Sequence, residues 1–133
     1  VHNAAVLLDE GRIAHVQLKT MLPNYGVFDE KRVFEAGRGL GVVVWRGIRL
    51  ALLVCEDVWA AEQVQALAQQ SPELVLVLNA SPFEADKMAQ RRAVAFAAAQ
   101  KLKAPLLYVN MVGGQDDLVF DGASFALDAD GAP

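Results

Sequence analysis

Apolar residues occur along this chain in short runs that turn residues separate, and in two longer segments with helical spacing. The first two runs, Ala4–Leu8 and Ile13–Leu18, flank the turn sequence DEGR and predict a β-hairpin. A second hairpin is predicted where Val42–Trp45 and Ile48–Cys55 flank an Arg-Gly pair. The later strand is apolar on both sides apart from one arginine, which favours an interior place in a covered sheet.

The second half of the chain alternates predicted helices with predicted strands. Apolar residues recur at helical spacing over Val58–Gln70, with Asp57 as the expected N-cap. The alanine-rich segment Ala85–Leu102 is a second helix, and its basic residues, Arg91 among them, are expected on a solvated side. The strands that accompany these helices are predicted at Leu74–Leu78, Leu106–Val112 and Ser124–Leu127. This alternation predicts an α/β domain with a mixed sheet, and two such sheets would pair as a four-layer sandwich.

Two segments have neither the helical nor the strand period. Thr20–Gly41 contains the turn sequence PNYG and closely spaced glycines, and a loop that long in a compact domain usually has a function. No helix follows those glycines, which excludes a dinucleotide phosphate loop. Gly113–Gly122 places Gln115 and three aspartates, Asp121 among them, around apolar residues. The pattern leaves open whether this second segment lines a site or covers a surface.

Composition narrows the class of protein further. The chain has 133 residues, 54% of them apolar and 21% charged, which predicts a single globular domain with a real core. Sixteen acidic against twelve basic residues give a formal charge of −4. Because nucleic-acid affinity comes largely from Lys and Arg at phosphates, the acidic balance and the absence of a basic run argue against a nucleic-acid partner.

Cysteine usage and hydropathy indicate the compartment. A single cysteine, Cys55, excludes an intrachain disulfide and suits a reducing environment. No apolar run approaches the roughly 18 residues of a membrane span, so we expect a cytoplasmic protein with no membrane partner. His2 and His15 lack metal-ligand spacing, so no metal site is expected. The chain lacks an initiator methionine, and we expect it to be a piece of a longer protein with no second domain of its own.

The residue with the strongest chemical signal is Cys55, where a predicted strand ends and a helix begins. Amides at such a turn favour a thiolate or an oxyanion, although a lone cysteine is equally often a small buried hydrophobe. Lys19 ends the second predicted strand; it is either a solvated charge or a cation that lowers the thiol pKa and binds an oxyanion. An acid or base is still needed, and spacing selects none of Glu30, Glu35, Glu56 and Glu84.

Three segments carry a family resemblance. Residues 19–32 (KTMLPNYGVFDEKR), 55–59 (CEDVW) and 112–125 (VGGQDDLVFDGASF) resemble the nitrilase-type glutaminase domains of glutamine-dependent NAD synthetases. CED alone would indicate only the wider nitrilase superfamily. The resemblance covers essentially the whole chain, so residues 1–133 are identified as the central part of such a carbon-nitrogen hydrolase domain, with an incomplete α-β-β-α sandwich.

The resemblance implies a Glu-Lys-Cys triad. Cys55 would then be the nucleophile that attacks the glutamine amide, and Lys19 and the backbone amide of Glu56 would stabilise the tetrahedral intermediate. Tyr25 and Ser81 match residues of the glutamine pocket. The triad glutamate would lie upstream of the first hairpin, so we expect negligible hydrolysis by this chain alone.

The resemblance also implies a partner domain and leaves alternatives. The ammonia would pass to a synthetase domain that uses ATP and Mg²⁺ to amidate deamido-NAD, within a homo-oligomeric parent enzyme, while the glutaminase domain itself needs no cofactor. A stand-alone amidase of the same superfamily is a second hypothesis, against which the GGQDDLVFDG loop and the Tyr25 segment count. A third is a non-catalytic assembly module.

Overall fold

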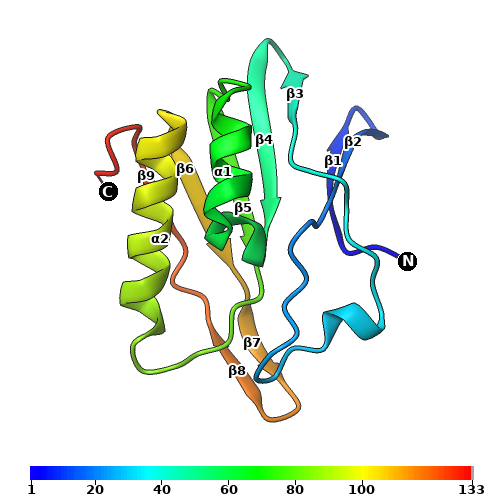
Figure 1. The fold of residues 1–133 in the computed structure, drawn as a ribbon, viewed down its shortest axis with the longest axis vertical. Coiled ribbons are helices and arrows are strands. Elements are labelled where there is room, and N and C mark those ends of the chain that lie inside the picture. The colour runs from blue at the N-terminus through cyan, green and yellow to red at the C-terminus, as the bar shows by residue number, and fades with distance from the viewer. Residues whose placement is uncertain (133) are drawn as a thin grey trace.

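A five-stranded mixed sheet forms the centre of the structure, a computed structural model in which residues 1–132 are described (Figure 1). The strands lie in the order β3 (Val42–Trp45), β4 (Ile48–Val54), β5 (Leu74–Asn79), β6 (Leu106–Asn110) and β9 (Phe125–Leu127). The three middle strands are parallel and the two edge strands are antiparallel to their neighbours. The predicted mixed α/β sheet is therefore confirmed.

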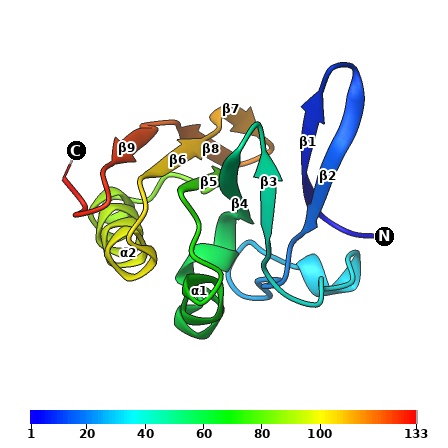
Figure 2. The ribbon, with the colours of Figure 1, turned by 90° about the horizontal axis from the view of Figure 1, so that it is seen from above.

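Two helices, α1 (Ala61–Ala68) and α2 (Lys87–Leu102), cover one face of this sheet, as Figure 2 shows. Each follows a parallel strand, as right-handed β-α-β crossovers require. The core between the helices and the sheet contains these buried residues: Leu53, Val64, Leu67, Val75, Val77, Ala95, Ala99 and Leu106. Among the described residues, no helix is long and apolar enough to cross a membrane.

The helix after β4 begins later than the sequence predicts. Cys55–Trp59 forms a 3₁₀ turn, and α1 begins only at Ala61. Asp57 does not cap α1, because its carboxylate binds backbone groups of the β2 and β4 ends instead. The prediction of a continuous helix over Val58–Gln70 was wrong because a tertiary contact takes the proposed cap.

The segment after β6 also differs from the prediction. The strand ends at Asn110, and the chain then forms a separate hairpin of β7 (Val112–Gln115) and β8 (Leu118–Asp121) beyond the end of the sheet (Figure 1). Gly113 and Gly114 have weak strand propensity, so the pairing of the two strands keeps them extended, and Asp116 and Asp117 form the turn between the strands. Gly122 closes the hairpin at φ 63°, where an added Cβ would lie 2.5 Å from Val112 Cγ2.

The opposite face of the sheet is only partly covered. The hairpin of β1 (Ala4–Asp9) and β2 (Arg12–Leu18) contacts β4, where Ala5 packs with Leu50 and Leu52. Figure 2 shows this hairpin at the β3 side of the sheet. Over β5 and β6, apolar side chains stay in solvent: Leu78, Leu107 and Val109 are 41%, 38% and 49% exposed. In an α-β-β-α sandwich this face packs against the second sheet.

The exposed face over β5 and β6 predicts that the isolated 133-residue chain self-associates, because a contiguous apolar patch on a sheet favours association. Light scattering should show species larger than a monomer. Replacing both Leu107 and Val109 by lysine should shift the population toward monomer, whereas the matched Val44→Lys change on the edge strand β3 should not. A stable monomer of the unaltered chain would contradict this prediction.

Candidate active site

The cysteine lies on a strained turn at the carboxyl end of β4. Val54 ends the strand, and Cys55 begins the 3₁₀ turn with φ 47°, in the left-handed region that non-glycine residues seldom adopt. Such strain persists only where the surrounding structure imposes it, and it concentrates at functional sites. The half-buried thiol therefore stands at the end of the sheet where a ligand can reach it.

Lys19 and Glu30 line the same cavity as the thiol. Lys19 directly follows β2, is 1% exposed, and its Nζ donates to Glu30 Oε1 at 2.6 Å. Together with Cys55 and Phe28 they line a cavity of about 250 Å³. A buried ion pair is therefore fixed beside the nucleophile candidate, and the lysine charge is not a solvated one.

Asp57 joins the lysine segment to the cysteine turn. Its fully buried carboxylate accepts four hydrogen bonds. Oδ1 accepts from Thr20 N at 2.9 Å, Thr20 Oγ1 at 2.7 Å and Met21 N at 2.9 Å, and Oδ2 accepts from Val54 N at 3.0 Å. Thr20 follows Lys19 and Val54 precedes Cys55, so one carboxylate sets the positions of both.

A second, smaller cavity of about 30 Å³ is also lined by Cys55. It is lined by Tyr25, Phe28, Cys55, Glu56, Trp59, Ser81 and Lys87. Tyr25 donates its hydroxyl hydrogen to Glu56 Oε1 at 2.8 Å. Burial, together with the neighbouring Glu56 carboxylate, raises the pKa of Tyr25 to about 12, so the tyrosine stays a donor at neutral pH. The structure thus brings together the sequence-predicted pocket residues Tyr25 and Ser81.

The sequence did not single out Lys87, at the start of α2. Its Nζ lies 5.5 Å from the centroid of the Trp59 ring and 3.9 Å from Glu84 Oε2.

Of the four acid candidates, Glu30 and Glu56 lie beside the thiol, whereas Glu35 interacts with His2 instead. The spacing of the loop could not have selected Glu30. The segment between Lys19 and Glu30 has no regular structure, so the sequence does not show that the two side chains meet.

Burial is the main influence on the pKa of the Cys55 thiol. It raises the pKa of Cys55, Lys19 opposes it, and the Glu56 and Glu30 carboxylates raise the pKa further, while a backbone hydrogen bond from Glu56 lowers it. The sequence expectation that Lys19 lowers the thiol pKa has the right sign, but desolvation outweighs it. The raised pKa favours the thiol over the thiolate at neutral pH.

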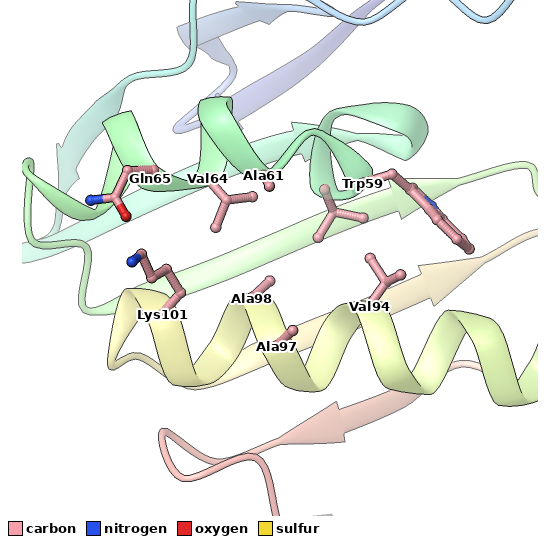
Figure 3. Close-up of a pocket in the computed structure, with 9 residues that line it drawn as sticks. Trp59, Ala61, Val64, Gln65, Val94, Ala97, Ala98 and Lys101 are labelled. Atoms are coloured by element: carbon pink, nitrogen blue, oxygen red, sulfur yellow. The ribbon is translucent and has the colours of Figure 1, made fainter.

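A mainly apolar groove lies away from Cys55, between α1 and α2. Figure 3 shows the space of about 390 Å³ between α1 and α2, lined mainly by Trp59, Val64, Val94, Ala97 and Ala98. Its single titratable side chain is Lys101, at the end of the groove (Figure 3). It therefore offers packing rather than chemistry. Within residues 1–132, no cluster of His, Cys, Asp or Glu could hold a metal ion.

The sheet, the helical layer and the Cys–Lys–Glu cavity define a protein of the nitrilase-like fold. The sequence profile described as "Carbon-nitrogen hydrolase" matches residues 1–133, and the chain belongs to this family. The predicted fold class is thereby confirmed.

The curated relatives share a description. A glutamine-dependent NAD(+) synthetase from Xanthomonas campestris pv. campestris is 47% identical, and one from Acinetobacter baylyi is 43% identical, each over 98% of this chain. The chain spans about a quarter of the length of these relatives, 24% in both cases. The resemblance to NAD synthetases that the sequence motifs carry is confirmed.

Solved structures of an NAD synthetase and of an amidase are similar to this chain. The glutamine-dependent NAD+ synthetase of Acinetobacter baumannii, in complex with ADP, matches with a TM-score of 0.92 and 43% identity over 98% of this chain and 25% of its own. An amidase from Nesterenkonia sp., with the acetamide moiety of fluoroacetamide covalently added to its active-site cysteine, matches with a TM-score of 0.84 and 35% identity over 98% of this chain and 48% of its own.

The charges around Cys55 predict opposite effects of two substitutions on the thiol pKa. Alkylation by iodoacetamide requires the thiolate, so its pH dependence reports that pKa for the single cysteine. Lys19→Met should move the midpoint to higher pH, and Glu30→Gln to lower pH, because Lys19 lowers and Glu30 raises the pKa. The control Lys31→Met removes an exposed charge and should leave the midpoint unchanged. Equal midpoints in all variants would refute this electrostatic account.

Asp57→Asn should destabilise the protein strongly. The amide would place a donor against backbone N–H groups that now donate to the carboxylate, and hydrogen bonds to a buried charge are worth more than neutral ones. We expect a loss of about 3 kcal/mol in the free energy of unfolding. Asp29→Asn, which removes only an exposed pair with Arg32, should cost less than about 0.5 kcal/mol. Urea titration followed by tryptophan fluorescence measures both, and similar losses would contradict the role of Asp57.

Proposed function

We propose that this chain is the central part of the glutaminase domain of a glutamine-dependent NAD synthetase, and that Cys55 attacks the side-chain amide of glutamine. The observation that carries the proposal is the cavity in which the Cys55 thiol and the buried Lys19–Glu30 ion pair meet. The cysteine adduct of the similar Nesterenkonia amidase supports a nucleophilic cysteine in this fold.

In the proposed reaction the Cys55 thiolate adds to the amide carbon, and the carbonyl electron pair moves onto oxygen. The backbone N–H of Glu56 and the Lys19 ammonium stabilise this oxyanion. Collapse of the intermediate expels the nitrogen as ammonia, once it is protonated, and leaves a thioester on Cys55. Water then adds to the thioester carbon, and glutamate leaves as the thiol re-forms.

A base must take the thiol proton and later activate the water. Glu30 Oε1 accepts a hydrogen bond from Lys19, so that carboxylate already orients the lysine. We assign the base, as the resemblance implies, to a glutamate upstream of β1 in the longer polypeptide. On this proposal the 133-residue chain alone hydrolyses glutamine negligibly.

The polar side chains around the small cavity match the charges at the amino-acid end of glutamine. Glu56 offers a carboxylate that can accept from an ammonium group, while Lys87 and the Ser81 hydroxyl can bind a carboxylate. A simple aliphatic amide has neither charge. This pairing of opposite charges beside Cys55 favours glutamine over the amide substrates of a stand-alone amidase, which remains the alternative because of the likeness to the Nesterenkonia enzyme.

The released ammonia would be consumed by a synthetase domain of the longer polypeptide. The curated relatives are described as NAD synthetases and are about four times as long as this chain, which supports that arrangement. There ATP and Mg²⁺ would activate deamido-NAD for amidation, in a homo-oligomeric enzyme. A free cysteine nucleophile suits a reducing compartment, so we place the enzyme in the cytoplasm.

In the full-length polypeptide, Cys55→Ala should reduce glutamate release from glutamine by at least about 10³-fold, since no other nucleophile can form the thioester. Glu35→Gln changes an exposed carboxylate outside both cavities and should retain the activity. Ammonia-dependent NAD formation should survive Cys55→Ala. Normal glutamate release by that variant would overturn the assignment, and faster hydrolysis of propionamide than of glutamine would favour the amidase alternative.

A further inference from the structure

Arg91, in the second turn of α2, is a buried charge whose three guanidinium nitrogens are all hydrogen-bonded. It is 1% exposed, and its Nη1 donates to both oxygens of Asp121 at the end of β8, at 2.8 and 3.1 Å. The guanidinium holds the pKa of the Asp121 carboxyl below its usual range, so the pair is ionised at neutral pH. A charge buried this completely needs such a partner.

The remaining donors of Arg91 all go to the loop after β5. Nη2 donates to the carbonyl oxygens of Ser81 and Pro82, each at 2.8 Å, and Nε donates to Ser81 Oγ at 3.2 Å. One side chain therefore binds both the backbone and the hydroxyl of Ser81, the residue that lines the small cavity beside Cys55.

The same loop is held from two other strands. Asn110, at the end of β6, accepts from Ser81 N at 2.9 Å and donates to the carbonyl of Gly122 at 2.9 Å. Phe83 N donates to the carbonyl of Val119 in β8 at 2.7 Å. These bonds fix the backbone of the loop, but only the bond from Arg91 Nε acts on the Ser81 hydroxyl.

The direction of that bond determines what the hydroxyl offers. Arg91 Nε can only donate, so Ser81 Oγ accepts, and the serine keeps its own hydrogen for an acceptor elsewhere. Ser81 lines the cavity with Glu56 and Lys87, so a ligand oxygen in that cavity is an acceptor within reach of the residue. A carboxylate oxygen, which Lys87 also attracts, has the matching chemistry.

We infer that Arg91 and Asp121 form a positioning pair that fixes the Ser81 hydroxyl as a hydrogen-bond donor to a carboxylate oxygen of the substrate. The inference rests on the proposed glutaminase function and deepens it. It also gives the aspartate of the VFDG sequence a role: Asp121 touches no substrate, and it keeps the Arg91 guanidinium in place so that Ser81 can bind.

The test uses the full-length polypeptide and glutamine as substrate. Asp121→Asn removes the charge that orients Arg91, and should raise KM for glutamine about 10-fold while kcat changes by less than about 2-fold. Asp121→Glu keeps the charge and should restore KM to within about 3-fold of the unaltered protein. Asp117→Asn, in the exposed tip of the same hairpin, is the matched control and should leave both constants unchanged.

Two further readouts separate positioning from a structural role. Alkylation of Cys55 by iodoacetamide, a reagent too small to need Ser81, should proceed at an unchanged rate in Asp121→Asn. In a Ser81→Ala background, Asp121→Asn should add nothing to KM, because its effect passes through the missing hydroxyl.

The opposite outcomes overturn the inference. It fails if Asp121→Asn raises KM equally with and without Ser81, if kcat falls together with the alkylation rate, or if Asp121→Glu behaves like Asp121→Asn. If the unaltered full-length protein releases no glutamate from glutamine, both the proposed function and this inference fail. If the unaltered protein is active and the variants give any of the three results above, the inference alone is refuted.

Discussion

The candidate site depends on one buried carboxylate. Lys19 follows a hairpin that belongs to a separate two-stranded sheet, so no ladder of the main sheet fixes its place relative to Cys55. Asp57 supplies that link across 37 residues of sequence, because it accepts hydrogen bonds from Thr20 and from Val54 at once. A buried charge is stable only with its hydrogen-bonding capacity filled, so the carboxylate and the two segments it joins must keep their arrangement together.

Within that arrangement the charges around the thiol shift its pKa in opposite directions. Lys19 favours the thiolate, but its ammonium is already paired with Glu30, and burial disfavours any charge on Cys55. The resting site therefore keeps an unreactive thiol. In the proposed reaction, a substrate carbonyl that displaces part of the Lys19–Glu30 interaction would gain the lysine as a donor when the oxyanion forms, which is when a positive charge stabilises it most.

The sequence pattern predicted the helices and strands whose formation depends on neighbouring residues in the chain. Both N-terminal hairpins, β5 and α2 follow from alternation, turn residues and alanine content. The start of α1 was wrong because Asp57 binds distant backbone groups, and the β7–β8 hairpin was missed because pairing overrides weak propensity. The place of Cys55 between strand and helix made it a candidate, whereas Glu30 was one of four equal candidates, and the structure places both in one cavity. Arg91 was expected in solvent, and its partner Asp121 is 30 residues away, beyond any local pattern.

The parallel strands explain why these separate contacts meet at one place. The carboxyl ends of β4, β5 and β6 lie at the same end of the sheet, and they deliver in turn the Cys55 turn, the Ser81 loop and Asn110. Loops at the end of a sheet have no β-ladder hydrogen bonds to fix them. Here two loops are each fixed by a buried charged side chain, and the two charges have opposite signs. Asp57 accepts from the loop on one side and Arg91 donates to the loop on the other. Acceptor-only and donor-only groups suit these places because one approaches backbone N–H groups and the other approaches carbonyls. The backbone groups that each loop presents thus dictate the sign of the charge that holds it, and Cys55 lines a cavity with the Ser81 loop and another with Lys19, which precedes Thr20.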